Sequence, residues 1–134
     1  AEETYRAYVD ALNQVDLSDP ETFEAVYAWT TGDANSGART SFSEMHADGW
    51  TVAGLSVVGE TTPIEATLAH PATVSIAACL DVSAVTLLDA DGNSVVDADR
   101  PPVQEVRVDT TTSSASPTGL LIADLDGSDE GICA

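Results

Sequence analysis

Apolar residues recur at helical spacing through the first third of the chain. From position 5 to position 15 they fall at steps of three and four, which places them on one face of a helix. Asp19 followed by Pro20 is typical of a second helix start, because aspartate caps free backbone N–H groups and proline suits the first helical position. Helical spacing then continues toward Gly32, and we expect this glycine to close the second helix as a left-handed cap.

A third helix is predicted to end at Gly49, another glycine in the position that commonly terminates a helix. One face of this helix carries Ala38, Phe42, Met45 and His46. The stripe is apolar apart from His46, so we expect it to face the interior. The first 49 residues therefore predict three helices in series.

After Gly49 the period changes from 3.6 residues to 2, and β-branched residues become frequent. Strands are predicted at 50–58, 64–68, 73–82, 85–88, 95–96, 104–112 and 119–125, with a hairpin turn at 89–93. Helices followed by an antiparallel meander indicate an α+β fold. We expect a single domain over residues 1–134, with three N-terminal helices packed on a curled antiparallel β-sheet.

Composition narrows the functional classes. The chain has 134 residues, 43% of them hydrophobic, which is enough for one core and too many for a disordered chain. It carries 23 acidic residues against 4 basic ones, and its formal net charge of -19 repels nucleic acids and anionic lipids. No apolar run approaches the roughly 18 residues that a membrane span needs. We therefore expect no nucleic-acid partner and no membrane span.

Two cysteines, Cys79 and Cys133, allow one intramolecular pairing, and we predict that they form a disulfide. Closing this loop stabilises the fold by about 4 kcal/mol in the chain-entropy model. Disulfides persist in oxidising compartments, so we expect an exported protein whose signal peptide has been removed. The expected location is secreted or attached to the cell envelope on its extracellular face.

Two acidic segments invite a metal site. In an EF-hand loop that starts at Asp89, position six would have to be glycine and position twelve a glutamate, but Ser94 and Arg100 occupy them. We interpret 89–93 as a solvated turn that binds no calcium. The acidic tail with Asp124, Asp126, Asp129 and Glu130 is interpreted as a polar chain end. We expect no metal and no cofactor.

Candidate chemistry is confined to a few side chains. His46 and His70 are the only histidines, and we expect His70 in an exposed loop. His46, on the apolar face of the third helix, is either a buried histidine bonded to a backbone or tyrosine oxygen or a catalytic base. The aromatic residues gather in the helical third, as core or as a pocket lining. The candidate pocket residues are Tyr8, Tyr27 and His46, and no catalytic residue is assigned.

The order of three helices and then a curled antiparallel sheet resembles the nuclear-transport-factor-two-like (cystatin-like cone) superfamily. Segments 27–32, 45–50 and 78–83 are similar to those of exported proteins or lipoproteins of high-GC Gram-positive bacteria. The resemblance implies a pocket where the helices close over the sheet. Enzymes of the superfamily use an Asp or a His there with aromatic donors, but their motifs have no residue-by-residue match in this chain.

Two functions remain open. The first is a non-enzymatic extracellular or envelope-attached domain that binds a partner protein or a small apolar ligand. The alternative is a small cone-fold isomerase or dehydratase that uses His46, with Tyr8 or Tyr27 as hydrogen-bond donor. A polar pair converging inside a cavity would favour the enzyme, and a cavity without one would favour the binding domain.

Overall fold

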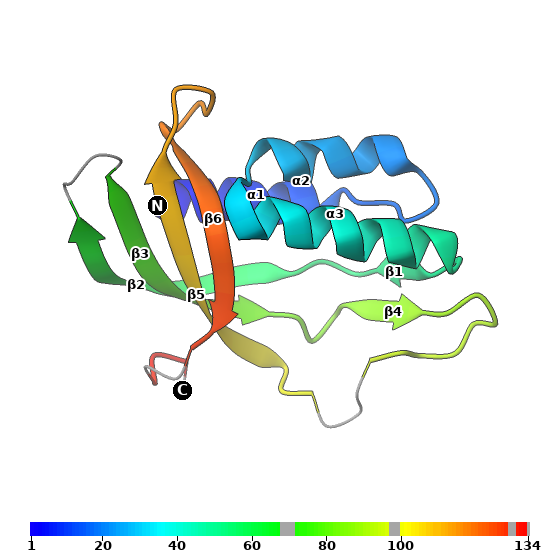
Figure 1. The fold of residues 1–134 in the computed structure, drawn as a ribbon. Coiled ribbons are helices and arrows are strands. Elements are labelled where there is room, and N and C mark those ends of the chain that lie inside the picture. The colour runs from blue at the N-terminus through cyan, green and yellow to red at the C-terminus, as the bar shows by residue number, and fades with distance from the viewer. Residues whose placement is uncertain (68–71, 97–99, 129–130, 134) are drawn as a thin grey trace.

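The helices lie together on one side of an antiparallel sheet in this computed structural model, which describes residues 1–67, 72–96, 100–128 and 131–133 (Figure 1). The fold is α+β, as predicted. The helical elements are α1 (Glu2–Asn13), the 3-10 turn η1 (Pro20–Phe23), α2 (Glu24–Ala28) and α3 (Gly32–Ala47). The strands are β1 (Thr51–Ala53), β2 (Val57–Thr67), β3 (Thr73–Asp81), β4 (Thr86–Leu88), β5 (Val103–Thr112) and β6 (Leu120–Gly127).

The second helical segment starts where the sequence predicts and ends earlier. Asp19 is the N-cap, its carboxylate accepting the Glu21 backbone N–H at 3.1 Å, and Pro20 is the first residue of η1. The expectation that Gly32 closes this helix is wrong. α2 already ends at Ala28, and Gly32, with a φ of 55°, is the first residue of α3. Helical spacing around this glycine belongs to two helices, which periodicity alone does not separate.

The end of α3 agrees with the prediction. Gly49 adopts a φ of 73°, and its N–H donates to the carbonyl of His46 at 3.1 Å. The N–H of Trp50 donates to the carbonyl of Met45 at 3.0 Å. These two bonds are a Schellman motif, which satisfies the last carbonyls of the helix and turns the chain toward β1.

Residues 51–67 and 73–88 form one long, interrupted antiparallel hairpin. The register of β2 with β3 pairs Val57 with Asp81, and the pairing resumes between β1 and β4 with Ala53 opposite Thr86. The predicted strand 50–58 is therefore broken in two, because Gly54 takes a φ of 87° between the halves. The hairpin turn at 89–93 is confirmed, but 95–96 is not a strand: a single bridge joins Leu88 to Ser94.

The main sheet has the order β2-β3-β5-β6, and both of its edges are partly covered. At the β2 edge, the Arg6 guanidinium donates to the carbonyls of Val58 and Gly59 at 3.3 and 3.2 Å. At the β6 edge, Ile122 exchanges backbone hydrogen bonds with Trp29 and Thr31 at 2.9 and 2.8 Å. These contacts satisfy edge groups that would otherwise be open to pairing with another chain.

Two hydrophobic clusters fill the space between the layers. The first joins α1 to the sheet through Tyr5, Val9, Ile76, Ala78, Val108 and Ile122. The second joins the helices to one another through Ala11, Val15, Leu17, Phe23, Val26 and Phe42. Ile76 and Ala78 share one face of β3 and pack with Tyr5 and Val9 of α1, while both faces of β3 are buried from Ser75 to Cys79. The second cluster continues toward the β1–β4 ribbon, where the layers separate enough to leave a cavity.

Candidate functional site

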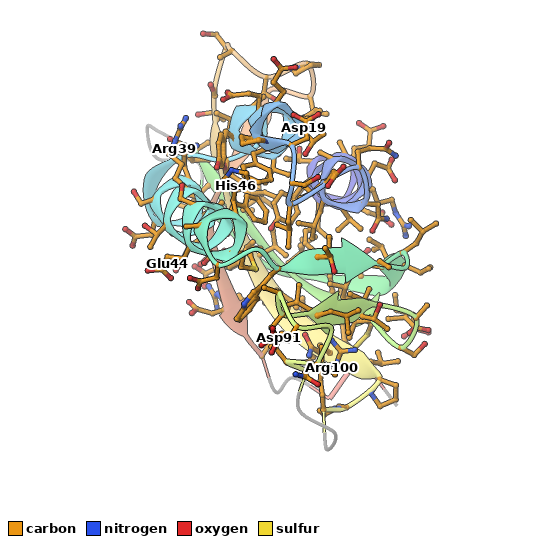
Figure 2. The ribbon with its side chains drawn as sticks, turned by 90° about the vertical axis from the view of Figure 1, so that its right-hand side faces the viewer. Asp19, Arg39, Glu44, His46, Asp91 and Arg100 are labelled. Atoms are coloured by element: carbon orange, nitrogen blue, oxygen red, sulfur yellow. A yellow bond between two sulfur atoms is a disulfide. The ribbon has the colours of Figure 1, made fainter. Side chains whose placement is uncertain are left out.

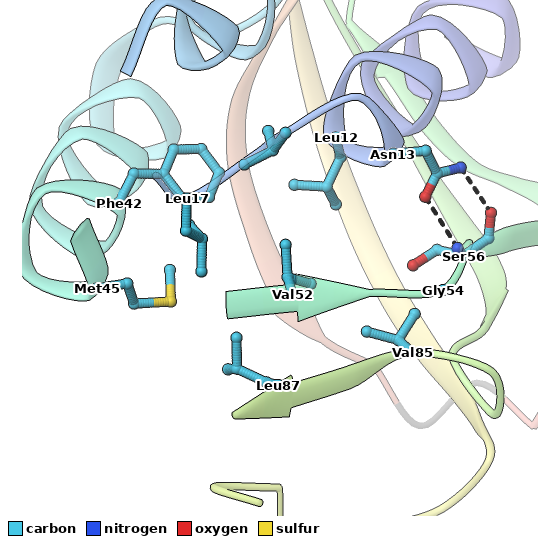
Figure 3. A pocket seen from close by; sticks show the side chains of 11 residues that line it. Leu12, Asn13, Leu17, Phe42, Met45, Val52, Gly54, Ser56, Val85 and Leu87 are labelled. Carbon is cyan, nitrogen blue, oxygen red and sulfur yellow. Dashed lines mark hydrogen bonds between the residues drawn. The ribbon is translucent and has the colours of Figure 1, made fainter. Parts of the chain in front are cut away.

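An apolar pocket lies between the end of α1, the C-terminal half of α3 and the β1–β4 ribbon (Figure 3). Its volume is about 190 Å³. Eight apolar side chains form most of its wall: Leu12, Val15, Leu17, Phe42, Met45, Val52, Val85 and Leu87. The helical stripe and the ribbon thus supply opposite walls of one cavity.

A polar clamp lies at one end of the pocket. The Asn13 side chain donates to the carbonyl of Ser56 and accepts the Ser56 backbone N–H, both at 2.9 Å (Figure 3). This pair of bonds joins the last residue of α1 to the segment that links β1 with β2. Both atoms of the amide group are engaged by the Ser56 backbone, so Asn13 fixes this end of the pocket wall.

The chemistry of this pocket is that of a receptor for apolar groups. Among the described residues that line it, none carries an acid, a base or a thiol, and the polar residues are Asn13 and Ser56. An engineered apolar protein cavity of about 150 Å³ binds benzene. A cavity of similar size and lining can therefore hold one aromatic ring or a short branched hydrocarbon.

His46 does not lie where the helical stripe predicts. Its side chain is exposed, so the expectation of a buried histidine beneath the helices is wrong. Its Nδ1 lies 2.7 Å from the carbonyl oxygen of Leu17, and its ring meets that of Phe23 edge-on at 6.4 Å. The η1–α2 segment packs beside this part of α3, so the ring lies in a crevice at the outer surface (Figure 2). The contact with a backbone carbonyl is therefore made at the surface and not in the core, so neither expectation for His46 is met.

Two of the three candidate pocket residues share one hollow, and the third lies in another. Tyr27 and His46 line one open hollow of about 460 Å³ between α2 and α3, together with Arg39, whose guanidinium stacks 4.2 Å from the Tyr27 ring. Tyr8 lines a different groove, between α1, α3 and β6, and burial raises its pKa. None of the three lines the apolar pocket. Tyr8 is thus separated from His46, whereas Tyr27 and His46 line one open hollow outside the apolar pocket.

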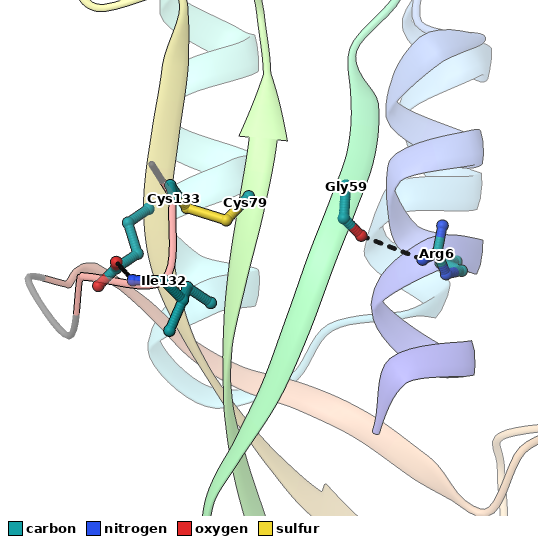
Figure 4. The surroundings of a disulfide bond; sticks show 6 residues. Arg6, Gly59, Cys79, Ile132 and Cys133 are labelled. Carbon is teal, nitrogen blue, oxygen red and sulfur yellow. Dashed lines mark hydrogen bonds between the residues drawn. A yellow bond between two sulfur atoms is a disulfide. The ribbon is translucent and has the colours of Figure 1, made fainter.

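The predicted disulfide is present and ties the chain's end to β3 (Figure 4). Cys79 and Cys133 are bonded, with their Cα atoms 5.7 Å apart. The tail is held further by Glu105, whose carboxylate accepts the Ile132 backbone N–H at 2.9 Å and whose carbonyl accepts that of Ser128 at 3.1 Å. The disulfide thus fastens a segment that also docks on β5.

The acidic turn is built as its sequence indicates. One carboxylate oxygen of Asp89 accepts the backbone N–H groups of Asp91 and Asn93 at 2.9 and 3.0 Å, so it stabilises the turn itself. Among the described residues, no group of three or more His, Cys, Asp or Glu side chains is arranged to hold a metal ion. His70, Asp129 and Glu130 lie outside the described residues.

The carboxyl group of Asp126 gives a pH prediction. The charge of Asp124, a hydrogen bond between the two carboxyl groups and the charge of Asp109 raise the pKa of Asp126 above 3.8. A raised pKa in the folded state means that the ionised group destabilises the fold at neutral pH. We expect Asp126→Asn to raise the free energy of unfolding at pH 7. The gain should shrink as the pH falls through the folded-state pKa and vanish below 3.8.

Urea titrations at pH 7, 5 and 3.5 measure this effect. Asp91→Asn is the matched control, because it removes the same charge from an exposed turn. An equal gain for both variants would show that net charge, and not the contact with Asp124, is responsible.

The residues of the pocket were only partly visible in the sequence. Phe42 and Met45 belong to the predicted stripe of α3, but Val52 and Leu87 appeared only as members of two separate strands. The pairing of Val52 with Leu87 in the β1–β4 ribbon brings them into one wall. The hairpin-turn signal at 89–93 indicated that 85–88 turns back, but carried no information about which strand it meets.

Comparisons with known proteins establish the fold. No family model matches the chain, and neither does any protein of curated function. The intermembrane-space region of the chloroplast protein ARC6 has a TM-score of 0.61 at 13% identity, covering 94% of this chain and 92% of that one. The periplasmic domain of DotI has 0.59 at 14%, covering 94% and 91%. A periplasmic fragment of TraM has a TM-score of 0.54 at 10% sequence identity, covering 93% of this chain and 95% of that one.

These three similar structures all come from domains outside the cytoplasm, in the periplasm or the intermembrane space of the chloroplast. At such low identity the likeness concerns the path of the chain and not its side chains. In the part of the chain that the structure describes, no helix is both long and apolar enough to cross a membrane.

Proposed function

We propose that this protein is a non-enzymatic domain of the cell exterior or envelope that binds a small apolar ligand in the pocket between α1, α3 and the β1–β4 ribbon. The observation that carries the proposal is the pocket itself, about 190 Å³ in volume and walled mainly by apolar side chains. Apolar surface of this kind gains free energy when a ligand displaces poorly bonded water. The ligand should be uncharged, because no side chain on the described walls carries a charge that could neutralise a charged ligand.

The exterior location rests on two further observations. The Cys79–Cys133 bond fits an oxidising compartment, where disulfides persist. The three similar folds are domains of the periplasm or of an intermembrane space. We also propose that the fold is a member of the cone-like architecture that the helix and strand order resembles, with the pocket at the side where the sheet continues into the ribbon.

Binding of benzene and indole to the protein tests the proposal. We expect saturable heats in calorimetry and localised amide shifts at Met45, Val52 and Leu87. At ten times the dissociation constant, a ligand bound only by the folded state raises the free energy of unfolding by about 1.4 kcal/mol. Heats that rise linearly with benzene concentration, without saturation, would contradict the proposal.

A filled pocket supplies the control. Val52→Phe places a ring in the cavity and should abolish benzene binding while the protein stays folded. Val95→Phe makes the same change at a residue that does not line the pocket and is 37% exposed. Binding should survive in Val95→Phe. Equal loss in both variants would place the benzene site elsewhere.

A further inference from the structure

A second hollow lies on the other side of Leu12 and Phe42 from the apolar pocket. It is a groove of about 300 Å³ between α1, α3 and β6, and we call it the Tyr8 groove. Leu12 and Phe42 line both hollows, and Tyr8 and Leu125 complete an apolar and aromatic wall. The wall that α3 contributes to the groove is open at Gly37, which has no side chain, and a Cβ added there would meet nothing within 4 Å.

Two carboxylates stand on this groove from different elements. Asp33 is in the first turn of α3 and is exposed, whereas Asp124 is half-buried on β6. Neither forms an ion pair with any residue that the structure describes. One oxygen of Asp124 accepts the Leu125 backbone N–H at 3.0 Å, and its carboxyl group also shares a hydrogen bond with that of Asp126. The remaining lone pairs of the Asp124 carboxylate are open to another donor.

The aromatic rings add to the preference for a cation. The face of a tyrosine or phenylalanine ring attracts an ammonium group, and Tyr8 is stacked on Tyr5 with ring centroids 6.0 Å apart, which fixes its orientation. Burial raises the pKa of Tyr8, so its hydroxyl stays neutral at physiological pH. The net charge of -19 draws basic partners toward the whole surface.

We propose that the Tyr8 groove binds a lysine side chain of a basic partner protein. The methylene stem lies along Leu12 and Leu125, and the ammonium group meets Asp33 and Asp124. A lysine side chain has this form, a compact charge on a flexible apolar stem. None of the 134 residues can be the occupant, because all four basic residues among them are arginines and none is a lysine. The inference does not depend on the function proposed for the apolar pocket.

Two blocked tripeptides test the proposal, one with lysine and one with norleucine between alanines. Norleucine keeps the apolar stem and lacks the ammonium group. In titrations followed by amide chemical shifts, we expect the lysine peptide to shift Ala34, Gly37 and Leu125 saturably and the norleucine peptide to bind at least about five-fold more weakly. Salt at 0.5 M should weaken only the lysine peptide. Equal midpoints for the two peptides would overturn the proposal.

Charge-neutral variants locate the contact. Asp33→Asn and Asp124→Asn should each weaken lysine-peptide binding about two- to five-fold, and Asp124→Asn keeps an oxygen for the Leu125 N–H. Asp91→Asn is the matched control, since it makes the same charge change in the turn beside Gly49, at the opposite end of α3 from Asp33. An equal loss in Asp91→Asn would overturn the groove as the site. Val52→Phe should leave the lysine peptide bound, so failure of either proposal is recognised separately.

Discussion

Gly54→Ala is expected to cost about 2–5 kcal/mol of folding free energy. Gly54 has a φ of 87°, a left-handed conformation that costs a residue with a Cβ roughly 1–2 kcal/mol. The added Cβ would also overlap the carbonyl oxygen of Ala84 and lie 2.6 Å from its carbonyl carbon. Because backbone cannot rotate away as a side chain can, the two strands of the long hairpin would have to separate, at a further cost of about 1–3 kcal/mol.

Two other glycines separate these contributions. Gly92 has a φ of 85°, but a Cβ added there would meet nothing within 4 Å, so Gly92→Ala should cost only the conformational part, about 1–2 kcal/mol. Gly37 is inside α3 with open space and no positive φ, and Gly37→Ala should stabilise the protein by about 0.5–1 kcal/mol. Urea unfolding of the three variants measures the order. A loss at Gly54 no larger than at Gly92 would show that the contact with Ala84 relaxes freely.

Removal of the disulfide is expected to have a comparable effect. Cys79 and Cys133 are separated by 54 positions. In the chain-entropy model, opening this loop lowers the free energy of the unfolded chain by about 4 kcal/mol. The folded form also gains freedom when its tail is released, which makes this value an upper limit. We therefore expect the double variant Cys79→Ala/Cys133→Ser to lose about 2–4 kcal/mol.

Reduction of the native protein should reproduce the loss, and a reductant should leave the double variant unchanged. Mass spectrometry of the non-reduced native protein should show two hydrogens fewer than the reduced form. Two free thiols in the protein isolated from an oxidising medium would contradict the structure. A reduced protein as stable as the oxidised one would show that the unfolded chain is already constrained in this region.

The pH and binding predictions involve smaller changes in free energy, but each of them compares a variant with a matched control. Each compares two carboxylates or two valines that differ in surroundings and not in chemistry. The control Asp91→Asn serves both Asp126 and the Tyr8 groove, because the same charge is removed from a turn whose geometry depends on the neighbouring Asp89 carboxylate.

Local signals in the sequence located most elements correctly. Asp19 caps the second helical segment because its carboxylate satisfies a backbone N–H two residues away, and Gly49 ends α3 because a left-handed residue closes the Schellman bonds. The strand 73–82 was recognisable from its alternation. The disulfide followed from there being one possible pair. In each case the deciding contact lies within a few residues of the chain or admits no alternative.

The tertiary structure decided what lies inside the molecule. His46 is at the margin of a helical stripe, and whether such a residue is covered depends on the segment that packs beside it, here η1 and α2, which leaves its ring at the surface. The break at Gly54 arises where two strands approach closely, which alternation does not record. The apolar pocket needs α1, α3 and the pairing of Val52 with Leu87 at once. Periodicity assigns a face to each element, but cavities form between elements whose separation only packing determines.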